Sequence, residues 1–270
     1  MFRLLFDNPE RAAELYYALT GVKCNPDEIQ IITITTTISG RLKNDLAFVV
    51  ANRAIICGEH QSTTSENMPV RFLMYIGLLY EKWIKMQGEE EFLYSTKLLP
   101  LPTPEFVVFY NGITKRPDKE TLYLSSAFKT GSRDDKALGS LELEVPVYNI
   151  NKGINENLFE KSETLRQYSE FIAKFHDNKK TFDLDRAVKE TIEYCVKNDI
   201  LVEFLREHGG KIVSILSAEY NEEAARRVHE RELREDIAII MLKKKIDIDI
   251  IAECTGIPRE KLLEMQRELA

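Results

Sequence analysis

A chain of 270 residues is long enough to form one substantial hydrophobic core with a smaller unit appended to it. Hydrophobic residues at 44% and charged residues at 30% are typical of a water-soluble globular protein, and no apolar run is long enough to cross a membrane, so the cytoplasm is the expected compartment. The formal net charge of −7 argues against a protein that coats nucleic acid nonspecifically, because such binding depends on neutralising phosphate charges. Four cysteines and four histidines lack the spacing of a zinc site.

The first part of the chain predicts a helix followed by a strand. Asn8 is a suitable N-cap for a helix over Pro9–Tyr17, which has proline in its first turn. The β-branched run Ile29–Thr35 predicts the first strand. Glu14 lies on the predicted helix, where we expect a solvated surface position.

Two apolar runs, Leu46–Val50 and Ala54–Gly58, predict a pair of strands joined by a three-residue loop. The register that follows from such a loop places Asp45 opposite Glu59. Two carboxylates facing each other in otherwise apolar strands are destabilising, so a cation between them is expected. In the alternative interpretation, Asp45 caps the end of its strand and Glu59 lies at a solvated margin of the sheet.

A proline in the first turn and apolar residues at helical spacing predict a helix over Pro69–Gln87. Arg71 lies near the start of this helix and therefore near the two carboxylates. Its planar guanidinium suits either a phosphate group or a structural ion pair with Glu59 or Glu66, and both alternatives remain open. Tyr75, four residues further on, is expected in the core.

The middle of the chain predicts further strands and then helices. Strands are expected over Glu105–Tyr110, which ends at an Asn-Gly turn signal, and over Glu142–Asn149. The polar residues 115–140 between them predict a loop. Helices are expected over Phe159–Phe175 and Leu184–Glu207. The resulting order of elements is α-β-β-β-α-β followed by helices, which is an α/β fold with a helical extension.

The last part of the chain predicts a mixed-charge helix over Glu219–Lys245 and then two short helices. The segment Ile248–Met265 is similar to a helix-turn-helix, with Gly256 at the turn and Pro258 opening the second helix. That second helix carries as many acidic as basic residues, which favours a packing or oligomerisation unit over DNA targeting. A homodimer is left open.

Several motifs occur in a fixed order along residues 1–215. They are Lys43-Asn44-Asp45, Glu59-His60-Gln61-Ser62-Thr63, Asn67-Met68-Pro69-Val70-Arg71, Leu79-Tyr80-Glu81-Lys82, Pro102 to Gly112, and Leu158 to Tyr168. In these motifs the chain resembles the recombination-promoting nuclease/transposase family of the PD-(D/E)XK nuclease superfamily. The resemblance implies a restriction-endonuclease-like αβββαβ core, with a central mixed sheet flanked by helices, over residues 1–176. A helical extension over 177–215 and a C-terminal helical region over 216–270 follow.

The resemblance also implies Mg²⁺-dependent hydrolysis of DNA phosphodiester bonds, in the service of recombination or mobile-element movement. Asp45 and Glu59 match the two acidic ligands of Mg²⁺, for which Mn²⁺ is a possible substitute. Gln61 matches the third motif position and is expected to position the attacking water. Lys43 and Arg71 are the expected contacts to DNA.

This chain departs from most of the superfamily at Gln61, where lysine is usual. A neutral amide can donate a hydrogen bond but supplies no positive charge, although the family that the chain most resembles commonly has glutamine there. A noncutting DNA- or protein-binding regulator is therefore the alternative function, and RNA is a less favoured substrate. His60 points to the opposite face of its strand, where core packing is favoured over metal binding.

Overall fold

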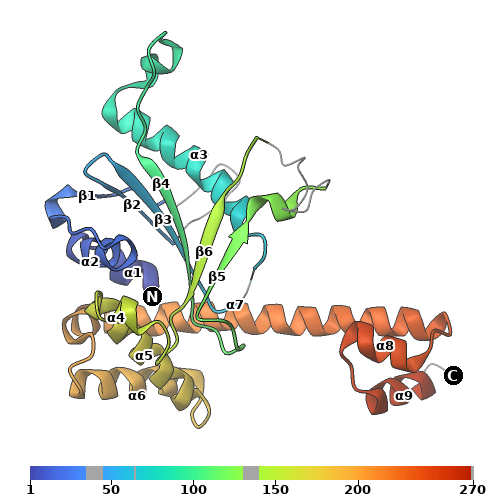
Figure 1. Cartoon of the computed structure of the whole chain (residues 1–270). Coiled ribbons are helices and arrows are strands. Elements are labelled where there is room, and N and C mark those ends of the chain that lie inside the picture. Colours follow the sequence, from blue (N-terminus) through green and yellow to red (C-terminus); the bar gives the residue numbers. More distant parts are fainter. Residues whose placement is uncertain (35–44, 64, 130–139, 269–270) are drawn as a thin grey trace. The chain divides into compact units, whose positions relative to one another are not determined.

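The computed structural model describes residues 1–34, 45–63, 65–129 and 140–268. It separates into two compact units, residues 1–209 and residues 210–270. The first unit is a six-stranded mixed sheet flanked by helices, and the second is helical (Figure 1). Helix α7 (Val202–Lys243) begins in the first unit and ends in the second.

The sheet has the strand order β1-β2-β3-β4-β6-β5. Its strands are β1 (Ile29–Ile31), β2 (Leu46–Val50), β3 (Ala54–Gln61), β4 (Thr103–Tyr110), β5 (Lys119–Tyr123) and β6 (Glu144–Asn149). The three central strands β3, β4 and β6 are parallel to one another, whereas β1, β2 and β5 pair antiparallel with their neighbours. Because parallel neighbours need a crossover connection, β3 and β4 are joined through a long helix.

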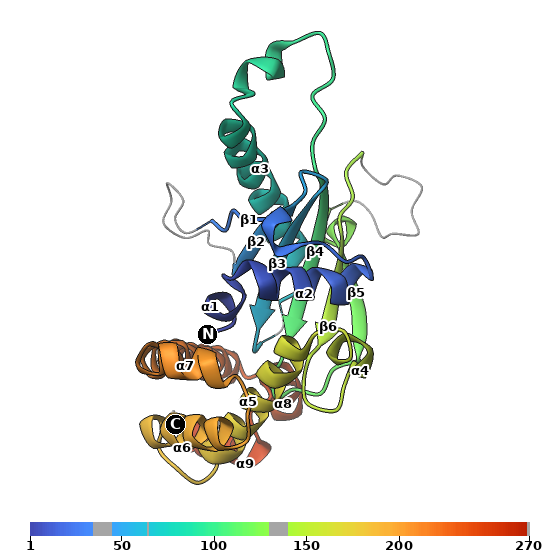
Figure 2. The same cartoon turned by 90° about the vertical axis from the view of Figure 1, so that its left-hand side faces the viewer.

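Helices cover both faces of this sheet. The helices of the first unit are α1 (Phe2–Phe6), α2 (Pro9–Thr20), α3 (Met68–Gln87), α4 (Glu156–Phe159), α5 (Glu163–Lys179) and α6 (Leu184–Lys197), followed by the start of α7. The apolar side of α3 packs on one face of the sheet, and Phe2 of α1 and Tyr168 of α5 lie against the opposite face. Figure 2 shows α2 passing in front of the strands. Residues of β2 and β3 are buried on both faces, as expected of central strands.

The β2–β3 hairpin has the register that the sequence predicts. Its loop is Ala51–Arg53, and the first two loop residues have φ angles of 48° and 54°. Val49 pairs with Ile55, and the ladder ends at the pair Leu46–Gly58. The next positions along the two chains are Asp45 and Glu59, so the hairpin brings both carboxylates to the same end.

Strand β1 is shorter than the predicted Ile29–Thr35, of which Thr35 lies outside the described residues. It ends at Ile31, and beyond it the hydroxyl of Thr33 replaces the strand ladder. Thr33 Oγ1 accepts a hydrogen bond from the backbone N–H of Ala47 at 3.0 Å, and the Ala47 carbonyl accepts from the Ile32 N–H at 2.8 Å. A threonine side chain that competes for backbone groups in this way ends regular pairing.

The polar segment 115–140, predicted as a loop, contains a strand, so that prediction was wrong for part of it; residues 130–139 lie outside the described residues. Strand β5 (Lys119–Tyr123) pairs antiparallel with β6 at the edge of the sheet, and a short 3₁₀ helix, Leu124–Ala127, follows it. None of its residues is fully buried. Charged side chains are common on edge strands, which explains why composition alone indicated a loop.

The predicted helices differ from the observed ones mainly at their ends. Helix α2 extends to Thr20, and its N-cap Asn8 accepts from the Arg11 N–H at 2.9 Å as predicted. The predicted helix Phe159–Phe175 is divided at Ser162, whose hydroxyl caps α5. The predicted helix Leu184–Glu207 is divided between α6 and α7.

The division between α6 and α7 has a local cause in the backbone. Asp199 and Leu201 have φ angles of 57° and 49°, a conformation that cannot continue a helix. The N–H of Leu201 donates at 2.7 Å to the side-chain carbonyl of Gln167 on α5. This contact between residues distant in sequence could not be deduced from helical periodicity.

The second unit contains the two short helices predicted from the sequence. The end of α7 packs with α8 (Ile248–Thr255) and α9 (Arg259–Glu268), and Gly256 between α8 and α9 has a φ of 69°. A positive φ of this kind favours glycine at the end of a helix. Within the described residues, no helix is both long and apolar enough to span a membrane.

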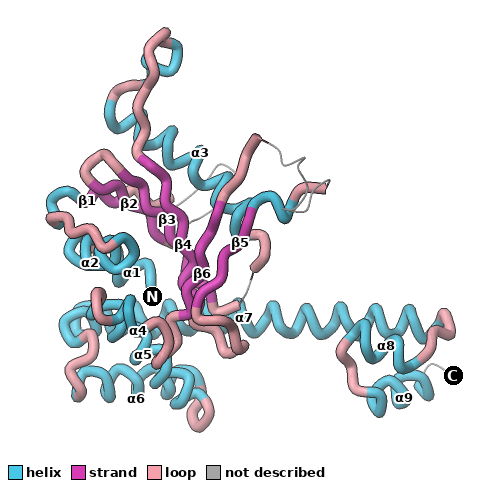
Figure 3. The backbone as a smooth tube through the Cα atoms, viewed as in Figure 1, coloured by secondary structure: helices cyan, strands magenta, loops and turns pink. Residues whose placement is uncertain are grey.

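The connection between α3 and β4 is mostly irregular (Figure 3). A 3₁₀ helix, Glu90–Tyr94, is its one described helical segment. The large side chains of Phe92, Leu93, Tyr94 and Leu98 are exposed there.

Gly112 is required for the turn that follows β4. A Cβ atom at this position would lie 2.0 Å from the backbone oxygen of Ser62 and 2.5 Å from the Tyr110 hydroxyl. Because a backbone atom cannot move aside cheaply, Gly112→Ala is expected to lower the free energy of unfolding by about 3 kcal/mol. Urea unfolding measures the change.

Gly77 provides the matched control for that substitution. It is exposed on α3, and a Cβ atom there would meet nothing within 4 Å. Gly77→Ala is therefore expected to raise stability by about 0.5–1 kcal/mol through helix propensity. Equal effects of the two substitutions would show that the turn tolerates a side chain.

Candidate active site

The hairpin places Asp45 and Glu59 together at one end of β2 and β3. Asp45 immediately precedes β2, and its Oδ2 accepts a hydrogen bond from the backbone N–H of His60 at 2.8 Å. Glu59 lies near the end of β3 with 3% of its surface exposed. The predicted alternative of a solvated Glu59 is therefore wrong.

The two carboxylate oxygens of Glu59 have different surroundings. Oε2 accepts from Arg71 Nη2 at 2.8 Å. Oε1 is buried and has no hydrogen-bond partner among the described residues. Burial, followed by the nearby charge of Asp45, raises the pKa of Glu59 to about 8, although Arg71 acts in the opposite direction. The charge of Arg71 therefore does not outweigh burial and the charge of Asp45, and a proton or a metal ion can supply further positive charge.

Arg71 is held by a tyrosine as well as by Glu59. The Tyr75 hydroxyl accepts hydrogen bonds from Arg71 Nε at 3.1 Å and from Nη2 at 2.8 Å. Tyr75 is buried, as predicted, and burial raises its pKa to about 12. The Arg71 side chain remains 37% exposed. One edge of the guanidinium is thus fixed by the protein, while part of the group is accessible to a ligand.

We expected Tyr75 only as a core residue and did not predict that its hydroxyl accepts hydrogen bonds from Arg71. Its spacing of four residues from Arg71 on one helix was the available signal, because such residues are neighbours on a helix surface. The second predicted partner of Arg71, Glu66, instead pairs with Arg116 at 3.3 Å. Of the predicted ion pairs, Arg71–Glu59 is the one that forms.

Tyr75→Phe is expected to lower the free energy of unfolding by about 1–2 kcal/mol, because Arg71 loses a buried acceptor of charge-assisted hydrogen bonds. Tyr80→Phe is the control, since the Tyr80 hydroxyl donates a neutral hydrogen bond to the Pro102 carbonyl at 2.8 Å. Urea unfolding should show a smaller loss for the control. A larger loss for Tyr80→Phe would argue that Tyr75 contributes only its ring.

Gln61 lies on the same face of β3 as Glu59, two residues further along. Its Nε2 donates to the sulfur of Met68 at 2.7 Å. The amide is therefore turned toward the start of α3. To donate a hydrogen bond to a water molecule instead, the Gln61 amide would have to break its hydrogen bond to the Met68 sulfur.

His60 lies on the opposite face of β3, in the apolar surroundings that the sequence predicts. Its ring stacks on Phe2 with ring centroids 5.0 Å apart, and Nε2 lies 2.9 Å from the Tyr168 hydroxyl. Burial, followed by the charge of the chain's amino terminus, lowers the pKa of His60 to about 3. The ring is consequently neutral, and its backbone N–H holds Asp45.

The other candidate residues have varied positions. Lys43 lies outside the described residues. Arg116, the partner of Glu66, also pairs with Glu120. We expected Glu14 at a solvated surface position, but its carboxylate forms two hydrogen bonds. It accepts from the N–H of Thr164 at 2.8 Å and from the hydroxyl of Thr164 at 2.7 Å. It thereby ties α2 to the first turn of α5.

The donors at this site suit Mg²⁺ better than zinc. Two carboxylates, one of which includes the unpartnered Oε1 of Glu59, offer hard oxygen ligands, and Mg²⁺ in proteins commonly takes one or two carboxylates and keeps several waters. Across the described ranges, no group of three or more histidine, cysteine, aspartate or glutamate side chains is placed to hold a metal. The structure thus brings together two carboxylates, those of Asp45 and Glu59, which are fewer side chains than such a group contains.

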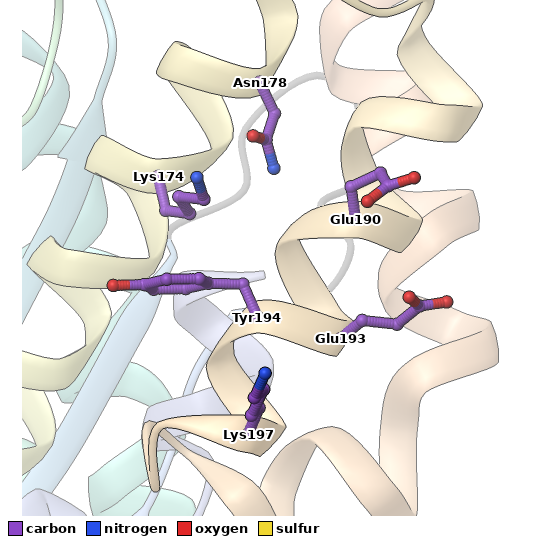
Figure 4. A pocket seen from close by; sticks show the side chains of 6 residues that line it. All are labelled: Lys174, Asn178, Glu190, Glu193, Tyr194 and Lys197. Atoms are coloured by element: carbon purple, nitrogen blue, oxygen red, sulfur yellow. The ribbon is translucent and has the colours of Figure 1, made fainter.

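A separate pocket lies between α5 and α6 (Figure 4). It is lined by Lys174, Asn178, Glu190, Glu193, Tyr194 and Lys197. The Lys174 ammonium lies 4.7 Å from the centre of the Tyr194 ring. Two lysines and two glutamates offset one another there, so the pocket has no strong preference for either sign of charge.

Comparison with models of protein families, with curated proteins and with solved structures finds no match to this chain. The structure shows a mixed α/β fold with a six-stranded sheet flanked by helices.

Proposed function

We propose that the chain is a Mg²⁺-dependent DNA endonuclease with a PD-(D/E)XK core, acting in recombination or mobile-element movement. The observation that carries the proposal is the pairing of Asp45 with the buried Glu59, whose Oε1 has no hydrogen-bond partner among the described residues. Leaving a buried carboxylate oxygen unpaired beside a second carboxylate is costly. A cation bound between the two carboxylates would offset this cost.

In this proposal Asp45 and Glu59 hold the ion, with Mn²⁺ as a substitute for Mg²⁺. The bound ion would polarise the scissile phosphate and favour ionisation of the attacking water. Gln61 would orient that water through its amide after releasing Met68. Arg71 would donate from its accessible edge to a phosphate oxygen, for which a planar guanidinium is well suited. Lys43 is the second proposed contact to DNA.

A catalytically inactive DNA- or protein-binding regulator with the same fold is the second candidate. The ion pair between Arg71 and Glu59 at 2.8 Å favours it, because the guanidinium already supplies one positive charge to the site. The neutral side chain of Gln61 and the net charge of −7 also favour the inactive regulator. The endonuclease proposal requires a divalent ion at Asp45 and Glu59 in addition to Arg71, whereas the regulator proposal does not.

Nicking of supercoiled plasmid in Mg²⁺, in Mn²⁺ and in chelator tests the endonuclease. Cleavage that requires either metal and stops in chelator is the expected result. A folded chain that binds plasmid without cutting it under any of these conditions would favour the regulator. Cleavage of a labelled RNA but not of DNA would retain the chemistry and change the substrate.

A further inference from the structure

The last part of α7 carries a row of apolar side chains that its own unit leaves uncovered. Leu233, Ile237 and Ile240 are 53%, 43% and 54% exposed. Their spacing of four and then three residues places them on one side of the helix. We refer to these three residues as the apolar row.

The opposite side of α7 forms the core of the second unit. Ala238 and Leu242 follow Leu233 and Ile237 by five residues, which places them about 140° further around the helix. Both are buried in a cluster whose other buried members are Ile251, Ile257 and Leu262. Helix α7 is therefore apolar on two nearly opposite sides, and α8 and α9 cover one of them.

The small size of that cluster favours a partner on the second side. Five buried hydrophobic side chains make up the core cluster that joins α7 to α8 and α9. Helical units this small commonly gain stability through oligomerisation, because their own cores bury little apolar surface. A partner that covers the apolar row would extend the buried surface to the other side of α7.

Nucleic acid is a poor partner for this unit. Arg259, at the start of α9, pairs with Asp249 at 2.9 Å, and Lys261 pairs with Glu235. Two of the three basic side chains that α9 could direct to phosphates are therefore paired with carboxylates, and the third is Arg267 in the last turn. A partner with an apolar surface of its own fits the row better.

The charges beside the row favour a second copy of the same chain. Asp236 and Lys243 are exposed, lie on the same side of the row and are separated by seven residues, or about two helical turns. In an antiparallel pair whose twofold axis lies level with residues 239 and 240, Asp236 of each copy would lie opposite Lys243 of the other. In that register Ile237 of each copy packs beside Ile240 of the other, and Leu233 lies at the edge of the interface. We propose that the apolar row is a dimer interface on which α7 of a second copy packs antiparallel.

Light scattering on the full chain after size-exclusion chromatography tests this interface. The unchanged chain is expected to have twice the chain mass of 31.2 kDa. Ile237→Asp is expected to give a single chain mass with unchanged circular dichroism, because it places two aspartates within the interface. Ile250→Asp is the matched control: Ile250 is similarly exposed but lies on α8, and that variant should stay dimeric.

A charge exchange keeps the test valid if Ile237→Asp fails to fold. Asp236→Lys and Lys243→Asp should each weaken the dimer, and the two substitutions together should restore it. A monomeric unchanged chain, a dimeric folded Ile237→Asp variant or the absence of restoration would overturn the proposal. None of these outcomes depends on nuclease activity, so failure of the proposed interface is distinguishable from failure of the proposed function.

Discussion

Replacing Glu59 with glutamine is expected to lower the rate of plasmid cleavage by about a thousandfold, since losing several kcal/mol of metal-based stabilisation corresponds to about three factors of ten. The same substitution is expected to leave the fold at least as stable at a pH near 8. Glutamine keeps an oxygen that accepts from Arg71 and removes the buried charge. Opposite effects on activity and stability are expected of a residue kept for function at some cost to the fold.

Two further variants complete this experiment. Asp45→Asn should lose cleavage to a similar extent, because it removes the second proposed ligand. Glu66→Gln removes the same charge from an exposed side chain and should leave cleavage nearly unchanged. Cleavage that survives Glu59→Gln would place the chemistry elsewhere. A large loss of stability in that variant would indicate that the Arg71–Glu59 pair is mainly structural.

Without metal, the free energy of unfolding is expected to fall as the pH rises from about 5 to about 8. The folded state holds a proton on Glu59 up to a pH of about 8, whereas the unfolded chain releases it near the ordinary value of 4.5. Stability from this group is therefore complete below the unfolded pKa and is lost as the pH passes the folded pKa. The full contribution is at most about 5 kcal/mol.

Urea unfolding in chelator across this pH range measures the effect. The difference in stability between the unchanged chain and Glu59→Gln isolates the contribution of Glu59 from other titrating groups. Added Mg²⁺ should stabilise the unchanged chain more at the upper end of the range, where no proton has to be displaced from the site. Parallel pH profiles for the two proteins would contradict a raised pKa at Glu59.

The carboxylate pair could be predicted because it depends on local rules. A three-residue loop fixes the register of a hairpin, and side chains alternate along strands, so Asp45 and Glu59 follow from Ala51–Arg53. The start of α2 could be predicted for a similar reason, since an N-cap contacts the backbone three residues away.

The parts that sequence reasoning missed depend on contacts between distant residues. Thr33 ends β1 by bonding to Ala47, and Gln167 holds the N–H of Leu201 at the break between α6 and α7. Glu14 caps a helix that lies about 150 residues further along the chain. Periodicity and propensity contain no information on such partners.

A Mn²⁺-binding measurement tests most directly whether Asp45 and Glu59 form a divalent-ion site. Binding is measured as a decrease in the electron paramagnetic resonance signal of the free ion. The unchanged chain and Glu66→Gln are predicted to bind the ion equally well. Asp45→Asn and Glu59→Gln are predicted to bind it at least about tenfold more weakly. Equal binding by all four proteins, or no binding by the folded unchanged chain, would contradict the proposed metal site.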